Sequence, residues 1–163
     1  MLMLENENID VKGKEVLLLG AGGAGRSVSK KLLDAGAKVS VYDKIYSKAQ
    51  DLSYEFGGLN VIERLNLKPC YLIVNATGVG MHESEGQSPV GADLLGLCEV
   101  AVDLIYAPLK SRFLQIAESS GKKIINGVAM LFYQAYYSEC MYFGIKPDKM
   151  QAKRFYEQYQ KVN

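Results

Sequence analysis

Short apolar runs alternate with longer amphipathic segments along the 163-residue chain. The apolar runs predict six strands, at residues 14–19, 38–42, 60–62, 71–75, 100–105 and 123–125. The amphipathic segments predict helices at about residues 24–35, 47–56 and 112–119, and two C-terminal helices at about 127–143 and 148–161. Ser47 and Ser111 stand where side chains that cap helix N-termini are expected.

This alternation predicts an α/β fold built on a doubly wound parallel sheet, with the intervening helices as right-handed crossovers. The dinucleotide-binding version of this architecture, the Rossmann fold, orders its strands 3-2-1-4-5-6, and we expect that order here. A ligand is then expected where the order reverses, between strands one and four.

A glycine-rich turn joins the first strand to the first helix. Its residues are Gly20, Ala21, Gly22, Gly23, Ala24 and Gly25. In a dinucleotide-binding turn the first glycine permits the tight bend, the second admits the pyrophosphate, and the third lets the helix pack on the strand. The anion lies against N–H groups at the positive end of that helix. Because glycine-rich turns also end structural strands, a purely structural turn is the alternative.

Composition excludes several classes of protein. A net charge of +1 predicts neither nucleic-acid nor membrane binding, and no apolar run has the length of a membrane span. The acidic N-terminus is unlike a targeting peptide, so we expect a cytoplasmic protein of one domain. The three cysteines predict small buried side chains in a reducing compartment. With His82 as the single histidine, no metal site is expected.

Four motifs, in order, make the chain resemble the cofactor domain of the shikimate and quinate dehydrogenases. They are Val11–Val16 leading into Gly20–Gly25, Asn75–Met81, Asp103–Leu109 and Asn126–Gln134. The resemblance implies that residues 1–163 form an NAD(P)-binding domain. It also implies that the catalytic lysine and aspartate belong to an N-terminal domain that this sequence lacks. We therefore expect no catalytic residue in this chain and no turnover by it alone.

The resemblance also assigns roles near the nicotinamide half of the cofactor. The residues that surround that half are Asn75, Ala76, Thr77, Leu104, Gly127 and Met130. Tyr106 and Gln134 would face the substrate, a molecule of the shikimate type. The residues themselves leave alternatives open: Asn75 and Thr77 also suit an Asx-type turn, and Met130 suits a core position.

Cofactor choice depends on Asp43, at the end of the second predicted strand. A carboxylate there accepts hydrogen bonds from the adenine ribose and repels a 2′-phosphate, so it favours NAD over NADP. Family members that prefer NADP commonly carry Asn-Arg-Thr where this chain has Asp43-Lys44-Ile45. Lys44 and Lys48 oppose that preference because both offer positive charge to a phosphate. We predict NAD; the alternative is that Asp43 caps the turn.

Two further possibilities come from the residues. The aromatic helix at 127–143 carries Met130, Tyr133, Tyr137 and Met141 at helical spacing, which predicts a homodimer or a last helix folded over them. The function itself has two alternatives. One is a stand-alone nucleotide-binding or regulatory module, and the other is a methyltransferase that binds S-adenosylmethionine.

Overall fold

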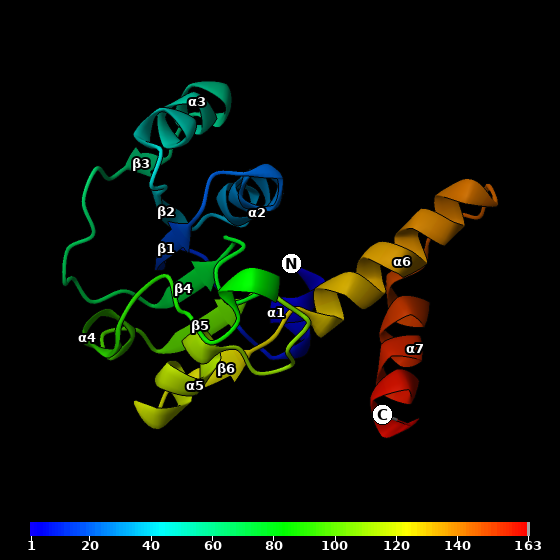
Figure 1. The fold of residues 1–163 in the computed structure, drawn as a ribbon. Coiled ribbons are helices and arrows are strands. Elements are labelled where there is room, and N and C mark those ends of the chain that lie inside the picture. Colours follow the sequence, from blue (N-terminus) through cyan, green and yellow to red (C-terminus); the bar gives the residue numbers. More distant parts are fainter. Residues whose placement is uncertain (163) are drawn as a thin grey trace. The chain divides into compact units, whose positions relative to one another are not determined.

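The computed structural model describes residues 1–162, and the chain divides into two compact units. The larger unit runs from Val11 to Gly127 and contains the whole sheet (Figure 1). The smaller unit combines Met1–Asp10 with the chain from Val128 onward. The predicted single domain over residues 1–163 stays a prediction.

A parallel six-stranded sheet forms the centre of the larger unit (Figure 1). Its order, β3-β2-β1-β4-β5-β6, confirms the prediction. The strands are β1 (Glu15–Leu19), β2 (Lys38–Tyr42), β3 (Asn60–Val61), β4 (Leu72–Asn75), β5 (Val100–Asp103) and β6 (Lys123–Ile125). Leu19 pairs with Tyr42 on one side and with Asn75 on the other, so the carboxyl ends of three strands meet at one edge.

Helices cover the sheet because β1, β4 and β5 bury nearly all of their side chains. The helical elements of this unit are α2 (Gly23–Asp34), α3 (Tyr46–Phe56), the 3-10 helix η1 (His82–Ser84), α4 (Ala92–Leu95) and α5 (Arg112–Ser119). Leu17 and Leu19 belong to one core cluster with Phe113 and Leu114 of α5. Leu18 lies between these two residues in β1. Since side chains alternate along a strand, it is buried against the opposite face of the sheet.

The helix ends test the predicted caps. Ser111 caps α5, because its hydroxyl accepts a hydrogen bond from the Leu114 N–H at 3.3 Å. The predicted cap at Ser47 is wrong: α3 begins one residue earlier, at Tyr46, and no side chain caps it. The sequence did not predict α4 and η1, which span four and three residues, too few to show a helical period.

The connection from β3 to β4, residues 62–71, contains no helix in the described chain. The chain passes from β3 to β4 as an irregular loop that ends near Cys70. Burial raises the pKa of the Cys70 thiol to about 12. Cys98 and Cys140 are buried, Cys70 is half-buried, and all three thiols are free.

The smaller unit consists of α1 (Leu2–Asn6), α6 (Val128–Tyr142) and α7 (Lys149–Val162). The Tyr133 side chain of α6 is 5% exposed and packs on Tyr156 of α7, with ring centroids 5.4 Å apart. Its hydroxyl also accepts a hydrogen bond from the Asn6 amide of α1. Helix α7 thus covers the part of the aromatic face around Tyr133, as one of the two predicted outcomes requires, whereas Met141 is 81% exposed. No helix within residues 1–162 is long and apolar enough to cross a bilayer.

Candidate functional site

The glycine-rich turn between β1 and α2 has two kinds of glycine. Gly20 has φ +100°, and a Cβ atom there would lie 2.9 Å from the Ala76 carbonyl oxygen. A Cβ atom on Gly25 would lie 2.0 Å from the Gly20 carbonyl oxygen. Gly22 and Gly23 have nothing within 4 Å of such an atom. The protein itself therefore requires Gly20 and Gly25, whereas the space at the other two is open.

Helix α2 begins directly at this turn. Gly22 is its N-cap residue, and no side chain caps this end of the helix. The first N–H groups of a helix and its dipole favour an anion at such a position. Open space above Gly22 and Gly23 makes room for one.

Asp43 follows β2 and connects two backbone segments. One carboxylate oxygen accepts from the Ala21 N–H at 2.8 Å, and the other accepts from the Ile45 N–H at 2.8 Å. The alternative role of Asp43 as a turn-capping group is therefore present in the structure. Each oxygen accepts a further hydrogen bond without losing the first, so a ribose contact is also compatible with this arrangement.

A cavity of about 500 Å³ lies at the carboxyl edge of the sheet. Its lining includes seven of the predicted site residues, namely Gly20, Gly22, Asp43, Lys44, Lys48, Ala76 and Thr77. The sequence did not single out the other lining residues: Leu19, Tyr42, Gly78, Val79 and Pro89. The volume falls in the range of small-molecule sites. The structure thus brings the predicted phosphate turn and the adenosine-reading residues to one cavity.

Asn75, at the end of β4, is fully buried and does not line this cavity. Its amide oxygen accepts from the Thr77 N–H at 3.1 Å and from the Thr77 hydroxyl at 2.6 Å. Its amide nitrogen donates to the Val79 carbonyl at 3.3 Å and to Asp103 at 3.1 Å. All four hydrogen-bonding positions of this side chain are occupied. The structure therefore supports the Asx-turn alternative, and direct contact between Asn75 and a cofactor stays a prediction.

Asp103, at the end of β5, is a buried carboxylate that sequence reasoning did not single out. It accepts hydrogen bonds from the Asn75 amide, from the Ile105 N–H at 3.0 Å and from the Ser111 hydroxyl. Burial raises its pKa above the ordinary value, although these three donors act in the other direction. A charged residue inside a run predicted to be a buried strand was the signal available in the sequence.

Beyond β5, Gly127 is fixed by packing within the larger unit. A Cβ atom on Gly127 would lie 2.1 Å from the Leu104 carbonyl oxygen, and the Gly127 N–H donates to the Ile105 carbonyl at 2.9 Å. Leu104 is buried, whereas the Tyr106 side chain is 44% exposed. The need for glycine at position 127 thus has a cause within the chain, independent of any nicotinamide ring.

The remaining predicted residues lie in other places. Met130 is half-buried and Gln134 is exposed, both on α6 of the smaller unit. His82 is exposed at the start of η1 with φ +51°. No group of metal-ligating side chains occurs among residues 1–162.

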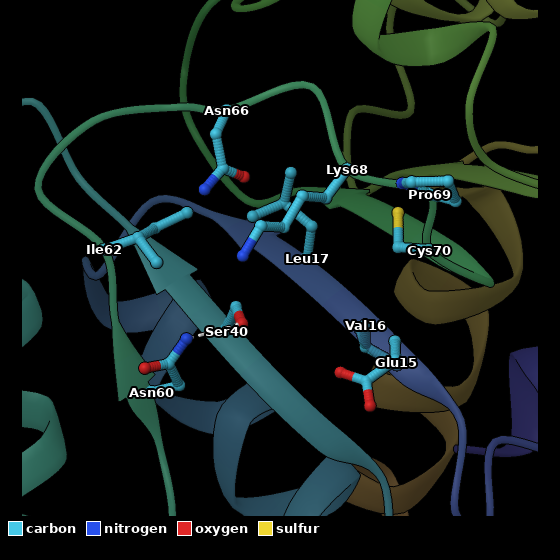
Figure 2. A pocket seen from close by; sticks show the side chains of 10 residues that line it. All are labelled: Glu15, Val16, Leu17, Ser40, Asn60, Ile62, Asn66, Lys68, Pro69 and Cys70. Carbon is cyan, nitrogen blue, oxygen red and sulfur yellow. Dashed lines mark hydrogen bonds between the residues drawn. The ribbon is translucent and has the colours of Figure 1, made fainter.

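A second cavity, of about 290 Å³, lies beneath the loop that joins β3 to β4 (Figure 2). Figure 2 shows Ser40 and Asn60 joined by a hydrogen bond of 3.1 Å, with Lys68 and Asn66 on the loop. None of the predicted site residues lines this cavity.

Known proteins with similar sequences are shikimate dehydrogenases. The sequence model of the shikimate/quinate 5-dehydrogenase family matches residues 3–79. The NADP(+) shikimate dehydrogenase of Carboxydothermus hydrogenoformans is 36% identical over 157 residues, which cover 90% of this chain and 56% of that enzyme. Along most of its length, the chain is thus similar to the shikimate dehydrogenases of this family.

Solved structures agree with the shikimate dehydrogenase assignment. A chorismate mutase/shikimate 5-dehydrogenase fusion protein from Clostridium acetobutylicum superimposes with a TM-score of 0.84 at 33% identity, covering 98% of this chain and 59% of that one. The Thermus thermophilus shikimate 5-dehydrogenase, in complex with NADP(H) and shikimate, gives 0.79 at 37% identity, with coverages of 93% and 57%. The chain thus spans little more than half the length of its shikimate dehydrogenase relatives.

Proposed function

We propose that the larger unit binds NAD(P) in the 500 Å³ cavity. The observation that carries this proposal is the meeting of an uncapped helix N-terminus, open glycines and Asp43 at the strand switch point. The Thermus thermophilus relative, which is in complex with NADP(H), supports it.

The residues present fit a dinucleotide. The pyrophosphate would lie above Gly22 and Gly23, where a side chain would otherwise stand. Asp43 would accept from the ribose hydroxyls, and Lys44 and Lys48 would offer positive charge at the same cavity. Thr77 would contact the cofactor from the end of β4.

The activity that we propose for the complete enzyme is that of a shikimate dehydrogenase-like oxidoreductase. When bound, NAD(P) supplies hydride chemistry at its nicotinamide ring. This chain would orient that cofactor, with Ala76, Leu104, Gly127 and Met130 toward the nicotinamide half. Tyr106 and Gln134 would face a substrate of the shikimate type, as the family resemblance implies.

The choice between the two cofactors depends on the balance between the Asp43 carboxylate and the charges of Lys44 and Lys48. We predict NAD because the Asp43 carboxylate would stand near a 2′-phosphate and repel it. Two facts oppose this preference: the relatives are named as NADP(+) enzymes, and two lysines line the cavity. The ratio of the two dissociation constants decides the matter.

A stand-alone nucleotide-binding module without catalysis is the second candidate. The ionisable groups that line the cavity are Asp43, Lys44, Lys48 and Tyr42. This candidate is favoured because Asp43, Lys44 and Lys48 are already assigned to nucleotide binding and not to proton transfer. We expect no measurable oxidation of shikimate or quinate by this chain with either cofactor. Steady turnover by contaminant-free protein would place an acid/base group within these 163 residues.

Titration calorimetry with NAD and NADP on the Gly22→Val variant tests dinucleotide binding. The Cβ atom meets no protein atom within 4 Å, so the variant should fold but fill the space meant for pyrophosphate. Gly91→Val is a matched control, since Gly91 is also an extended N-cap glycine with open space, at α4. Loss of binding in Gly22→Val alone is expected. Equal affinity in both variants would remove the glycine-rich turn from the site.

The smaller unit carries a second proposal, self-association. Its exposed apolar side chains include Met141 and Tyr142 at the end of α6 and Phe143 directly after it. Exposed apolar side chains are typical of protein interfaces, and two-fold dimers are the commonest soluble oligomers.

A further inference from the structure

Beneath the cavity, a buried carboxylate is connected to the Thr77 hydroxyl through a single amide side chain. We propose that Asp103 is a positioning residue that acts through Asn75 to present the Thr77 hydroxyl oxygen as a hydrogen-bond acceptor. The ligand group received by Thr77 is then a donor, such as a ribose hydroxyl or a carboxamide amino group, and not a phosphate oxygen. This inference rests on the proposed dinucleotide function of the cavity.

The orientation of the Asn75 amide follows from two partners that each allow only one direction. The Thr77 N–H donates only, and it lies 3.1 Å from Asn75 Oδ1. The Val79 carbonyl accepts only, and it lies 3.3 Å from Asn75 Nδ2. The oxygen of the amide therefore faces Thr77, and the amino group faces Asp103.

The direction of the Thr77 hydroxyl follows in turn. Asn75 Oδ1 only accepts, so the Thr77 hydroxyl at 2.6 Å must donate its single proton to it. The Val79 N–H donates into Thr77 Oγ1 at 3.1 Å, which occupies one lone pair. One lone pair of this oxygen is left for a ligand, and no proton is left.

Asp103 holds the amide in this orientation. Asn75 Nδ2 lies 3.1 Å from Asp103 Oδ1, and both residues are fully buried, so water does not replace this bond. The other two partners of the carboxylate, the Ile105 N–H and the Ser111 hydroxyl, are donors as well. Removing the carboxylate would leave a buried amino proton unpaired, so the Asn75 side chain would be held less firmly in the position that receives the Thr77 hydroxyl.

Thr77 prefers a ligand group that donates a hydrogen bond, because its hydroxyl has a lone pair but no proton to offer. Ionised phosphate oxygens only accept hydrogen bonds, so they would face the lone pair of Thr77 without a proton between them. Ribose hydroxyls and the nicotinamide carboxamide both donate. Within the same cavity, Lys44 and Lys48 are donors that suit the phosphates. The lining thus offers different chemistry to the different parts of a dinucleotide.

The test measures the dissociation constants of NADP and NAD by titration calorimetry, with circular dichroism and thermal unfolding on each variant. Thr77→Val should weaken binding roughly threefold to tenfold, because one hydrogen bond to the ligand is lost. Thr77→Ser keeps the hydroxyl and should stay within about twofold of the wild type.

Asp103→Ala should weaken binding as much as Thr77→Val. The double variant should be no weaker than either single variant, because Asp103 acts only through Thr77. If Asp103 had a merely structural role, the loss of affinity in the double variant would be the product of the losses in the two single variants. Asp103→Asn is the conservative variant: its amide oxygen faces Asn75 and its amino group faces Ser111, so binding should be retained.

Three outcomes would overturn the inference while the proposed function stands: binding that survives Thr77→Val, multiplied losses in the double variant, or a loss in folded Asp103→Asn equal to that of Asp103→Ala. If Asp103→Ala does not fold, the comparison of Thr77→Val with Thr77→Ser and the affinity of Asp103→Asn test the inference. If the wild-type chain binds neither NAD nor NADP, the proposed function falls and the inference falls with it.

Discussion

The carbonyl oxygen of Gly20 lies 2.0 Å from the position that a Cβ atom on Gly25 would occupy. The first turn of α2 therefore packs directly on the end of β1, and only glycine permits this approach. The third glycine of the motif has a role in folding that is separate from any ligand.

Gly25→Ala should lower the free energy of unfolding by about 3 kcal/mol, since the new methyl group must displace backbone. Urea unfolding measures the change. Gly23→Ala, in the same turn, is the control: its Cβ atom meets nothing within 4 Å, so stability should stay the same or rise by up to about 1 kcal/mol. Equal stabilities of the two variants would contradict the close packing of α2 on β1.

Asp43→Asn should shift the ratio of dissociation constants toward NADP by about 1–2 kcal/mol, because one negative charge near the 2′-phosphate disappears. The substitution also disturbs the hydrogen bonds from the Ala21 and Ile45 N–H groups, which weakens both cofactors alike. The ratio, measured by calorimetry, isolates the charge. Asp51→Asn, on an exposed position of α3, is the control. An unaltered ratio would mean that Asp43 serves only the turn.

The pKa of Asp103 gives a prediction with a definite sign. Burial raises this pKa above its ordinary value of 3.8, so the folded state holds the proton more tightly than the unfolded chain does. The free energy of unfolding should therefore fall as pH rises from about 4 through the raised pKa. Asp103→Asn removes this titration.

The measurable quantity is the stability of the wild type minus that of Asp103→Asn, from urea unfolding at a series of pH values. This difference should decrease as pH rises and then level off. An increase with pH would show that the three hydrogen-bond donors outweigh burial and hold the pKa of Asp103 below its ordinary value.

The sequence predicted the sheet well because most strands are marked by apolar residues, in short runs in β1, β4 and β5 and at alternating positions in β2. The bounds predicted for β2, Lys38–Tyr42, and for β6, Lys123–Ile125, match the structure. The cap at Ser47 was wrong because α3 starts one residue earlier, a difference that local pattern does not resolve. Helix α4 was missed because four residues carry no period.

The site was predicted only in part, because spacing along the chain reveals some of its residues but not the contacts between distant ones. Spacing placed the glycine-rich turn and Asp43 at one edge, and the structure brings both to one cavity. The hydrogen bonds of Asp103 depend on partners far away in the sequence, since Asn75 is 28 positions and Ser111 is eight positions from it. Only the folded chain shows that these residues meet.

The last prediction concerns self-association through α6. Of the four side chains that the sequence placed at helical spacing, Tyr133 is buried under α7, Met130 and Tyr137 are half-buried, and Met141 is 81% exposed. Tyr142 beside it is 85% exposed. Covering a few hundred Å² of such surface would contribute several kcal/mol, at about 25 cal/mol per Å², before the cost of association.

We therefore expect the apparent mass in light scattering to rise with protein concentration. The double substitution Met141→Ser and Tyr142→Ser should abolish this rise without lowering the unfolding temperature, because both side chains are exposed. Tyr54→Ser, an exposed tyrosine on α3 of the larger unit, is the matched control and should leave it intact. A wild-type chain that stays monomeric at all concentrations would refute the homodimer and leave α7 as the cover of the aromatic face.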